Sequence, residues 1–118
     1  MINIYSSSRY KINKSNLEKF AQIQLDKHHV AKISALNIAF VGKRKMKKIA
    51  LKYKDENVAL PVISFSYLRD PISSTDNVIG EVVICFPQAV LLAAERDKRV
   101  EPIMQQLIEH GIQNIFMK

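Results

Sequence analysis

The sequence predicts an α+β fold, with a small mixed sheet of about four strands, layered helices and a central hydrophobic C-terminal helix. Strand-like segments, which are short and either apolar or of alternating polarity, are interspersed with segments of helical periodicity. Two strand-like segments late in the chain follow each other without a helix between them, and residues 100–116 carry the most apolar helical stripe. The 118 residues are the size of one domain, so we expect a single domain over 1–118.

The composition is that of an ordinary globular protein, with 47% hydrophobic and 25% charged residues. No apolar run approaches the ~20 residues of a membrane span, and the first residues lack the features of a signal peptide. The single cysteine, Cys85, cannot form an internal disulfide. We therefore expect a cytoplasmic protein without a membrane partner.

The charge balance favours an anionic partner. There are 18 Lys and Arg against 11 Asp and Glu, a formal net charge of +7. Such an excess is typical of proteins that bind nucleic acid, although net charge alone is weak support.

A strand, a helix and a second strand are expected in the first third of the chain. Residues 1–6 and 35–41 have strand patterns, and apolar residues at helical spacing predict a helix from about Asn16 to Lys27. Ser15 and Glu18 have the spacing of a capping box at its start. This order implies a parallel pair of strands joined by a right-handed crossover.

The next helix is predicted over residues 43–54. Its apolar stripe is formed by Met46, Ile49, Ala50 and Tyr53. The rest is basic, with no acid before Asp55, and the candidate RNA-binding residues are Lys43, Arg44, Lys47, Lys48 and Lys54. Such a face can track phosphates, but it can equally be a solvated surface.

Two antiparallel strands and two helices complete the prediction. We expect strands over 62–67 and 78–86, separated by a loop over 69–77. Pro87 suits the first turn of a short helix that includes 89–95. In the hydrophobic last helix, Gly111 costs about 1 kcal/mol relative to alanine, which predicts close approach to a neighbouring strand.

A possible metal site lies on the last helix, where His110 stands one turn before Asn114. Two zinc donors four residues apart share one helix face, but an amide is a poor zinc ligand. From spacing alone, His110 is better interpreted as a residue at the core margin. His28 and His29 are better interpreted as residues of a solvated helix terminus. Cys85 is better interpreted as a small buried hydrophobic residue.

Five stretches, in order, resemble the YbeY family of bacterial rRNA maturation factors, which are described as metal-dependent endoribonucleases. They are residues 36–41, 49–54, 62–65, 79–85 and 107–111. Together they cover most of the predicted elements. The resemblance implies work on ribosomal RNA and the small ribosomal subunit, with zinc as the cofactor.

The family's metal motif is histidine-glycine-x-x-histidine-x-x-glycine-x-aspartate-histidine. By this resemblance the first histidine is His110 and the glycine is Gly111. The second histidine falls on Asn114, the next glycine falls on Met117, and the third histidine would lie beyond Lys118. Two of the three histidine ligands are therefore absent from this sequence.

Other family positions are partly kept. The arginine thought to contact RNA or the reacting phosphate falls on Lys54, which keeps the charge but loses the bidentate fork. The polar turn before the third strand falls on the apolar residues 59–62, whereas Ser64, Phe65 and Glu81 keep their types. The resemblance thus makes Lys54 and Glu81 candidate catalytic residues.

The sequence is best interpreted as a YbeY-like protein that binds RNA or the small subunit, with weak or lost nuclease activity and zinc absent or weakly bound. An active endoribonuclease that takes its metal through His110 with Asn114, Glu81 or a partner's side chain is the first alternative. A protein-binding adaptor whose lysines serve only solubility is the second.

Overall fold

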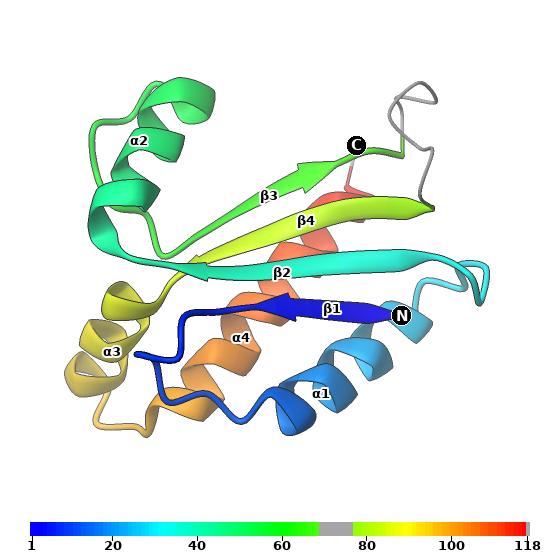
Figure 1. The fold of residues 1–118 in the computed structure, drawn as a ribbon, viewed down its shortest axis with the longest axis horizontal. Coiled ribbons are helices and arrows are strands. Elements are labelled where there is room, and N and C mark those ends of the chain that lie inside the picture. Colours follow the sequence, from blue (N-terminus) through cyan, green and yellow to red (C-terminus); the bar gives the residue numbers. More distant parts are fainter. Residues whose placement is uncertain (69–76, 118) are drawn as a thin grey trace.

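A computed structural model describes residues 1–68 and 77–117 (Figure 1). The strands are β1 (Ile2–Tyr5), β2 (Ala35–Val41), β3 (Val62–Ser66) and β4 (Val78–Cys85). The helices are α1 (Lys14–Asp26), α2 (Lys43–Lys54), α3 (Phe86–Glu95) and α4 (Val100–Phe116). The predicted α+β class is confirmed.

The strands form one mixed sheet in the order β1-β2-β4-β3. β1 is parallel to β2, β2 is parallel to β4, and β3 is antiparallel to β4. The predicted parallel pair around α1 and the predicted antiparallel pair are both confirmed. β4 lies inside the sheet, which explains its almost continuous apolar sequence.

The two faces of the sheet are covered unequally (Figure 1). Side chains at even-numbered positions of β2 and β4, such as Ile38 and Val82, join the main core with α1, α3 and α4. Side chains at odd-numbered positions, such as Val83 and Cys85, join a smaller core with Met46 of α2. Because α2 is the only helix on this second face among the described residues, those residues leave much of the face uncovered.

Helix α4 is central to the helical layer, as predicted, and contacts α1, α3, β3 and β4. Gly111 has no room for a side chain, since a Cβ there would lie 2.6 Å from Cγ1 of Val82 and 3.1 Å from Oγ of Ser64. Ser66 also ties β3 to α4 by donating a hydrogen bond to the carbonyl of Ile115 at 2.9 Å. The close approach predicted from Gly111 is confirmed.

Several predicted boundaries were wrong by a few residues. Helix α1 ends at Asp26 rather than Lys27, and it begins at Lys14 rather than Asn16. It begins earlier because the side chain of Asn13, not that of Ser15, caps it by accepting a hydrogen bond from the amide of Asn16. A side-chain cap two residues earlier adds half a turn. The predicted capping box of Ser15 is therefore wrong.

The other differences are at element ends. β1 is Ile2–Tyr5 rather than 1–6, β3 ends at Ser66 rather than 67, and β4 ends at Cys85 rather than 86. Helix α3 begins at Phe86 rather than near 89, and Pro87 lies in its first turn as predicted. β2, α2 and α4 have the predicted bounds. The predicted loop lies outside the described residues except at Asn77.

Candidate functional site

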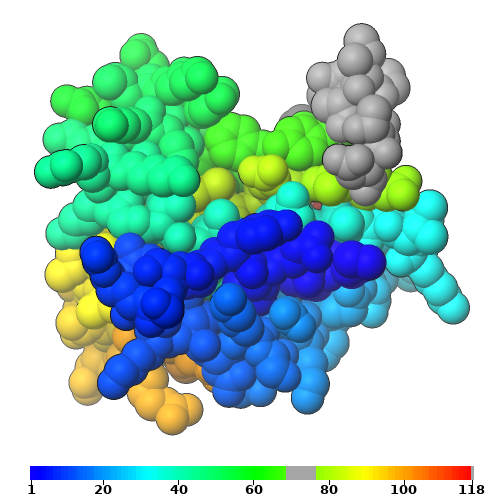
Figure 2. Space-filling view, in the orientation of Figure 1, coloured from blue at the N-terminus to red at the C-terminus, as the bar shows by residue number. Residues whose placement is uncertain are grey.

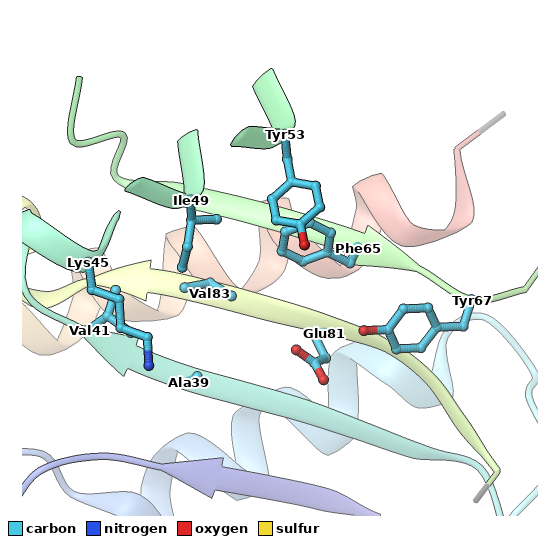
Figure 3. A pocket seen from close by; sticks show the side chains of 9 residues that line it. All are labelled: Ala39, Val41, Lys45, Ile49, Tyr53, Phe65, Tyr67, Glu81 and Val83. Carbon is cyan, nitrogen blue, oxygen red and sulfur yellow. The ribbon is translucent and has the colours of Figure 1, made fainter. Parts of the chain in front are cut away.

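An open groove lies on the uncovered face of the sheet, beside α2. Its volume is about 310 Å³. It is lined by Ala39, Val41, Lys45, Ile49, Tyr53, Phe65, Tyr67, Glu81 and Val83 (Figure 3). Figure 2 shows the surface hollowed beside α2, above β3 and β4. The groove forms because α2 covers only one end of this face.

Aromatic side chains form one wall of the groove. The rings of Tyr53 and Phe65 meet edge to face, with centroids 4.9 Å apart and an interplanar angle of 79°. Tyr53 is 55% exposed, and Nζ of Lys52 lies 5.2 Å from its ring centroid. Tyr53 was predicted to belong to the core-facing stripe of α2. Its side chain does face the sheet, but it is not buried.

The Glu81 carboxylate lies at the groove floor, and the Tyr67 hydroxyl points toward it from one side (Figure 3). The pKa of Tyr67 is raised, first by burial, then by the charge of Glu81 and hydrogen bonding to it, and last by Tyr53. All of these favour the protonated phenol, which can donate a hydrogen bond. Tyr67 is therefore suited to orient the carboxylate.

A row of polar side chains continues from Glu81 across the sheet. Glu81 is in register with Asn37 of β2, and Asn37 is in register with Asn3 of β1. Nδ2 of Asn3 donates a hydrogen bond to Oδ1 of Asn37 at 3.0 Å. In-register residues of neighbouring strands point to the same face, so the row places amide groups beside the carboxylate.

The basic residues of α2 are exposed, and none is buried by another element. Lys43, Arg44 and Lys47 line a second surface hollow of about 550 Å³, together with residues 57–59. Lys45 points instead into the groove (Figure 3). Lys54 is exposed in the last turn of α2, and the helix ends there because Asp55 adopts the left-handed conformation.

The predicted metal position is elsewhere in the structure. His110 and Asn114 are both exposed on α4, which packs on the face of the sheet opposite Glu81. The structure therefore does not bring Glu81 together with His110. His28 lies half-buried against α4, where its ring stacks on Phe116 with centroids 4.0 Å apart.

The donors present do not fit a zinc site. Within residues 1–68 and 77–117, no group of three or more His, Cys, Asp or Glu side chains is placed to hold a metal. His110 and Asn114 offer one imidazole and one neutral amide, whereas zinc sites use at least three charged, thiolate or imidazole ligands. Cys85 is fully buried in the smaller core, and burial raises its pKa.

The groove itself was missed by sequence reasoning. Tyr67 and Asn37 were not singled out, because a short strand pattern does not reveal which face a later helix leaves open. Alternation around Glu81 was the available signal, since a charged residue in an otherwise apolar central strand must point to solvent or to a partner.

Comparison with known proteins gives consistent matches. A family model described as "Endoribonuclease YbeY" matches residues 3–115. The chain is 30% identical over 79 residues to the Endoribonuclease YbeY of Cupriavidus pinatubonensis, covering 67% of this chain and 38% of that protein. It is 28% identical over 81 residues to the protein of the same description from Thermodesulfovibrio yellowstonii, covering 69% of this chain and 50% of that protein.

A relative from Dehalococcoides mccartyi, also described as Endoribonuclease YbeY, is 28% identical over 112 residues, covering 85% of this chain and 65% of that protein. The chain thus spans half or less of the first two relatives and about two thirds of the third. No helix in the described ranges is long and apolar enough to cross a bilayer.

The fold is also found in a solution structure of a Thermotoga maritima protein, with a TM-score of 0.67 and 19% identity over all of this chain and 73% of that one. At that identity the likeness concerns the fold alone. The family match extends over nearly the whole chain, from β1 to α4. The chain therefore belongs to the YbeY family.

Proposed function

We propose that this protein binds single-stranded RNA during ribosomal RNA maturation, and that its own metal-dependent nuclease activity is weak or lost. The observation that carries the proposal is the acid-free basic face of α2, which stands beside an open groove. Family membership supplies the expectation of an RNA substrate.

The charge of this face supports binding to a phosphate backbone. Seven of the twelve residues of α2 are basic, none is acidic, and all seven are exposed. Like charges on adjacent turns of one helix repel and destabilise it unless an anion lies among them. A phosphate chain along α2 would relieve that repulsion and release counterions.

The residues on α4 support weak or absent metal chemistry. Asn114 occupies the position of the family's second histidine, and its amide cannot replace imidazole as a strong zinc donor. Lys54 occupies the position of the family's arginine and cannot form the two parallel hydrogen bonds of a guanidinium with phosphate. RNA binding is thus favoured over cleavage as the activity of this chain.

Fluorescence anisotropy with single-stranded RNA tests the proposal. We expect the logarithm of the affinity to fall with the logarithm of the salt concentration. The double variant Lys47→Glu/Lys48→Glu should bind more weakly and reduce the slope by about 0.7 for each lost phosphate contact. Lys14→Glu/Lys19→Glu, which makes the same charge change on exposed residues of α1, is the matched control.

Other outcomes would favour the alternatives. RNA cleavage that depends on added metal and stops with chelator would make the protein an active endoribonuclease. No RNA binding at low salt, or binding that both double variants weaken equally, would contradict the role of α2. The adaptor interpretation, with lysines that serve only solubility, would then be preferred.

A further inference from the structure

We propose that the groove beside α2 holds one unstacked guanine base of a single-stranded RNA, whose pairing edge is recognised by Glu81 and Asn37. This inference rests on the proposed RNA-binding function and adds a base preference to it. Three properties of the groove support it, namely its apolar walls, the chemistry of Glu81 and the charge at its rim. The fourth support is Asn37, which does not line the groove but lies in register with Glu81 on the neighbouring strand.

The walls of the groove suit a flat, aromatic ligand. Ala39 and Val83 provide an apolar floor, and Tyr53 and Phe65 provide aromatic surface on one side (Figure 3). The volume of about 310 Å³ is at the lower end of the usual range for small-ligand sites, about 300–1,000 Å³. Proteins that read single-stranded RNA commonly stack its bases on such side chains.

Glu81 restricts which base can be accommodated. An ionised carboxylate only accepts hydrogen bonds. The pairing edge of guanine carries two adjacent donors, N1–H and the N2 amino group, which match the two oxygens of a carboxylate. Adenine, cytosine and uracil each place an acceptor next to their donor, and that acceptor would face the negative charge of Glu81 unpaired.

Asn37 adds the complementary donor. It lies in register with Glu81 on the neighbouring strand, and its Oδ1 already accepts a hydrogen bond from Asn3 at 3.0 Å. That hydrogen bond orients the amide, whose nitrogen carries two donors. A donor next to two acceptors is the complement of the O6, N1–H and N2 groups of guanine.

The surroundings also favour a nucleotide over an uncharged aromatic ligand. Lys45 points into the groove and Lys52 lies against Tyr53, so positive charge borders the pocket where a phosphate would follow the base (Figure 3). The hydroxyl of Tyr67 points toward the Glu81 carboxylate and is placed to orient it before the base arrives (Figure 3). A pre-oriented acceptor lowers the cost of binding.

Binding of short oligouridine with one central guanosine tests the inference, compared with the same RNA carrying inosine or adenosine there. Inosine lacks only the N2 amino group. We expect guanosine to bind about tenfold tighter than either, because a bidentate base contact discriminates to that degree. Equal affinity for the three RNAs would overturn the inference.

Variants locate the preference in the groove. Glu81→Gln should remove the preference for guanosine over inosine, and Asn37→Ala should reduce the preference over adenosine. Glu95→Gln makes the same change as Glu81→Gln at an exposed residue of α3 and should alter nothing. A guanosine preference that survives in correctly folded Glu81→Gln, as judged by circular dichroism, would exclude this groove.

The test separates this inference from the proposed function. Salt-dependent binding that is equal for all three RNAs leaves the RNA-binding function intact and contradicts the guanine site. If no RNA binds, the proposed function fails, and a nuclear magnetic resonance titration with guanosine monophosphate decides the groove. Shifts of the Glu81 and Asn37 amide signals would then support it, whereas shifts elsewhere or none would overturn it.

Discussion

The hydroxyl of Ser64 donates a hydrogen bond to the backbone carbonyl of Gly111, with the two oxygens 2.9 Å apart. The bond joins edge strand β3 to helix α4 across 47 residues of sequence. It forms because Gly111 has no side chain, which lets the helix backbone approach the sheet. This contact, together with the pairing of β3 with β4, therefore fixes the position of β3 and of Phe65 in the groove.

Gly111→Ala should destabilise the protein. The new Cβ would lie 2.6 Å from Cγ1 of Val82 and 3.1 Å from Oγ of Ser64, and relieving such overpacking costs roughly 1–3 kcal/mol. The higher helix propensity of alanine returns about 1 kcal/mol. We expect a net loss of up to about 2 kcal/mol in the free energy of unfolding, measured by urea denaturation.

Asn114→Ala is the matched control for this prediction, because Asn114 is exposed on the same helix. It should change stability little or raise it slightly. A Gly111→Ala protein as stable as the original would mean that α4 can shift away from Val82 without loss.

Asn114→His should create a zinc-binding pair on α4. His110 and position 114 are exposed and four residues apart, so two imidazoles there face each other across one turn. Zinc that binds only the folded protein stabilises it by about 2.7 kcal/mol at a free zinc concentration 100 times the dissociation constant, and therefore raises the melting temperature. Differential scanning fluorimetry with and without zinc measures the effect.

The double variant His110→Ala/Asn114→His keeps one imidazole and should lose the zinc response. If both variants respond equally, zinc binds elsewhere. A strong zinc response of the original protein would contradict the conclusion that the donors on α4 are insufficient.

Tyr67 should deprotonate at higher pH than an ordinary tyrosine, because burial and then the charge of Glu81 raise its pKa above about 10. In the unfolded chain the phenol loses its proton near that value, while the folded protein retains it. The unfolded state then binds fewer protons, so stability falls as pH rises above about 10. Glu81→Gln should lower the pKa of Tyr67, although burial remains.

Ultraviolet titration of tyrosinate measures this shift. The chain has four tyrosines, and the difference between the original protein and Tyr67→Phe isolates the signal of Tyr67. Glu95→Gln should leave that signal unchanged. An identical titration of Tyr67 in Glu81→Gln would show that the carboxylate does not interact with the phenol.

Local patterns were sufficient for much of the fold. Helix α2 was predicted at its observed bounds because Gly42 and Asp55 enclose a strongly amphipathic segment. The start of α1 was not, because Asn13, Ser15 and Asn16 are all good capping residues and only the folded chain selects among them. Short-range chemistry therefore fixes an element's type better than its first residue.

The groove depends on packing between distant segments, which local patterns do not contain. The helical stripe placed Tyr53 toward the sheet, but the extent of the sheet beneath it is set by β3 and β4. Likewise, the family resemblance supplied Glu81 and His110 as candidates, whereas only the fold puts them on opposite faces. Whether these residues act on RNA stays a prediction.

Alternation along β4 has an evolutionary consequence. Val82 packs under α4, while its neighbour Glu81 faces the groove. Consecutive residues of β4 therefore belong to opposite faces of the sheet. A lineage can thus replace a ligand on α4 without disturbing the opposite surface, and can remodel that surface without altering the interior. Members of one family can in this way differ on one face of the sheet while they keep the other.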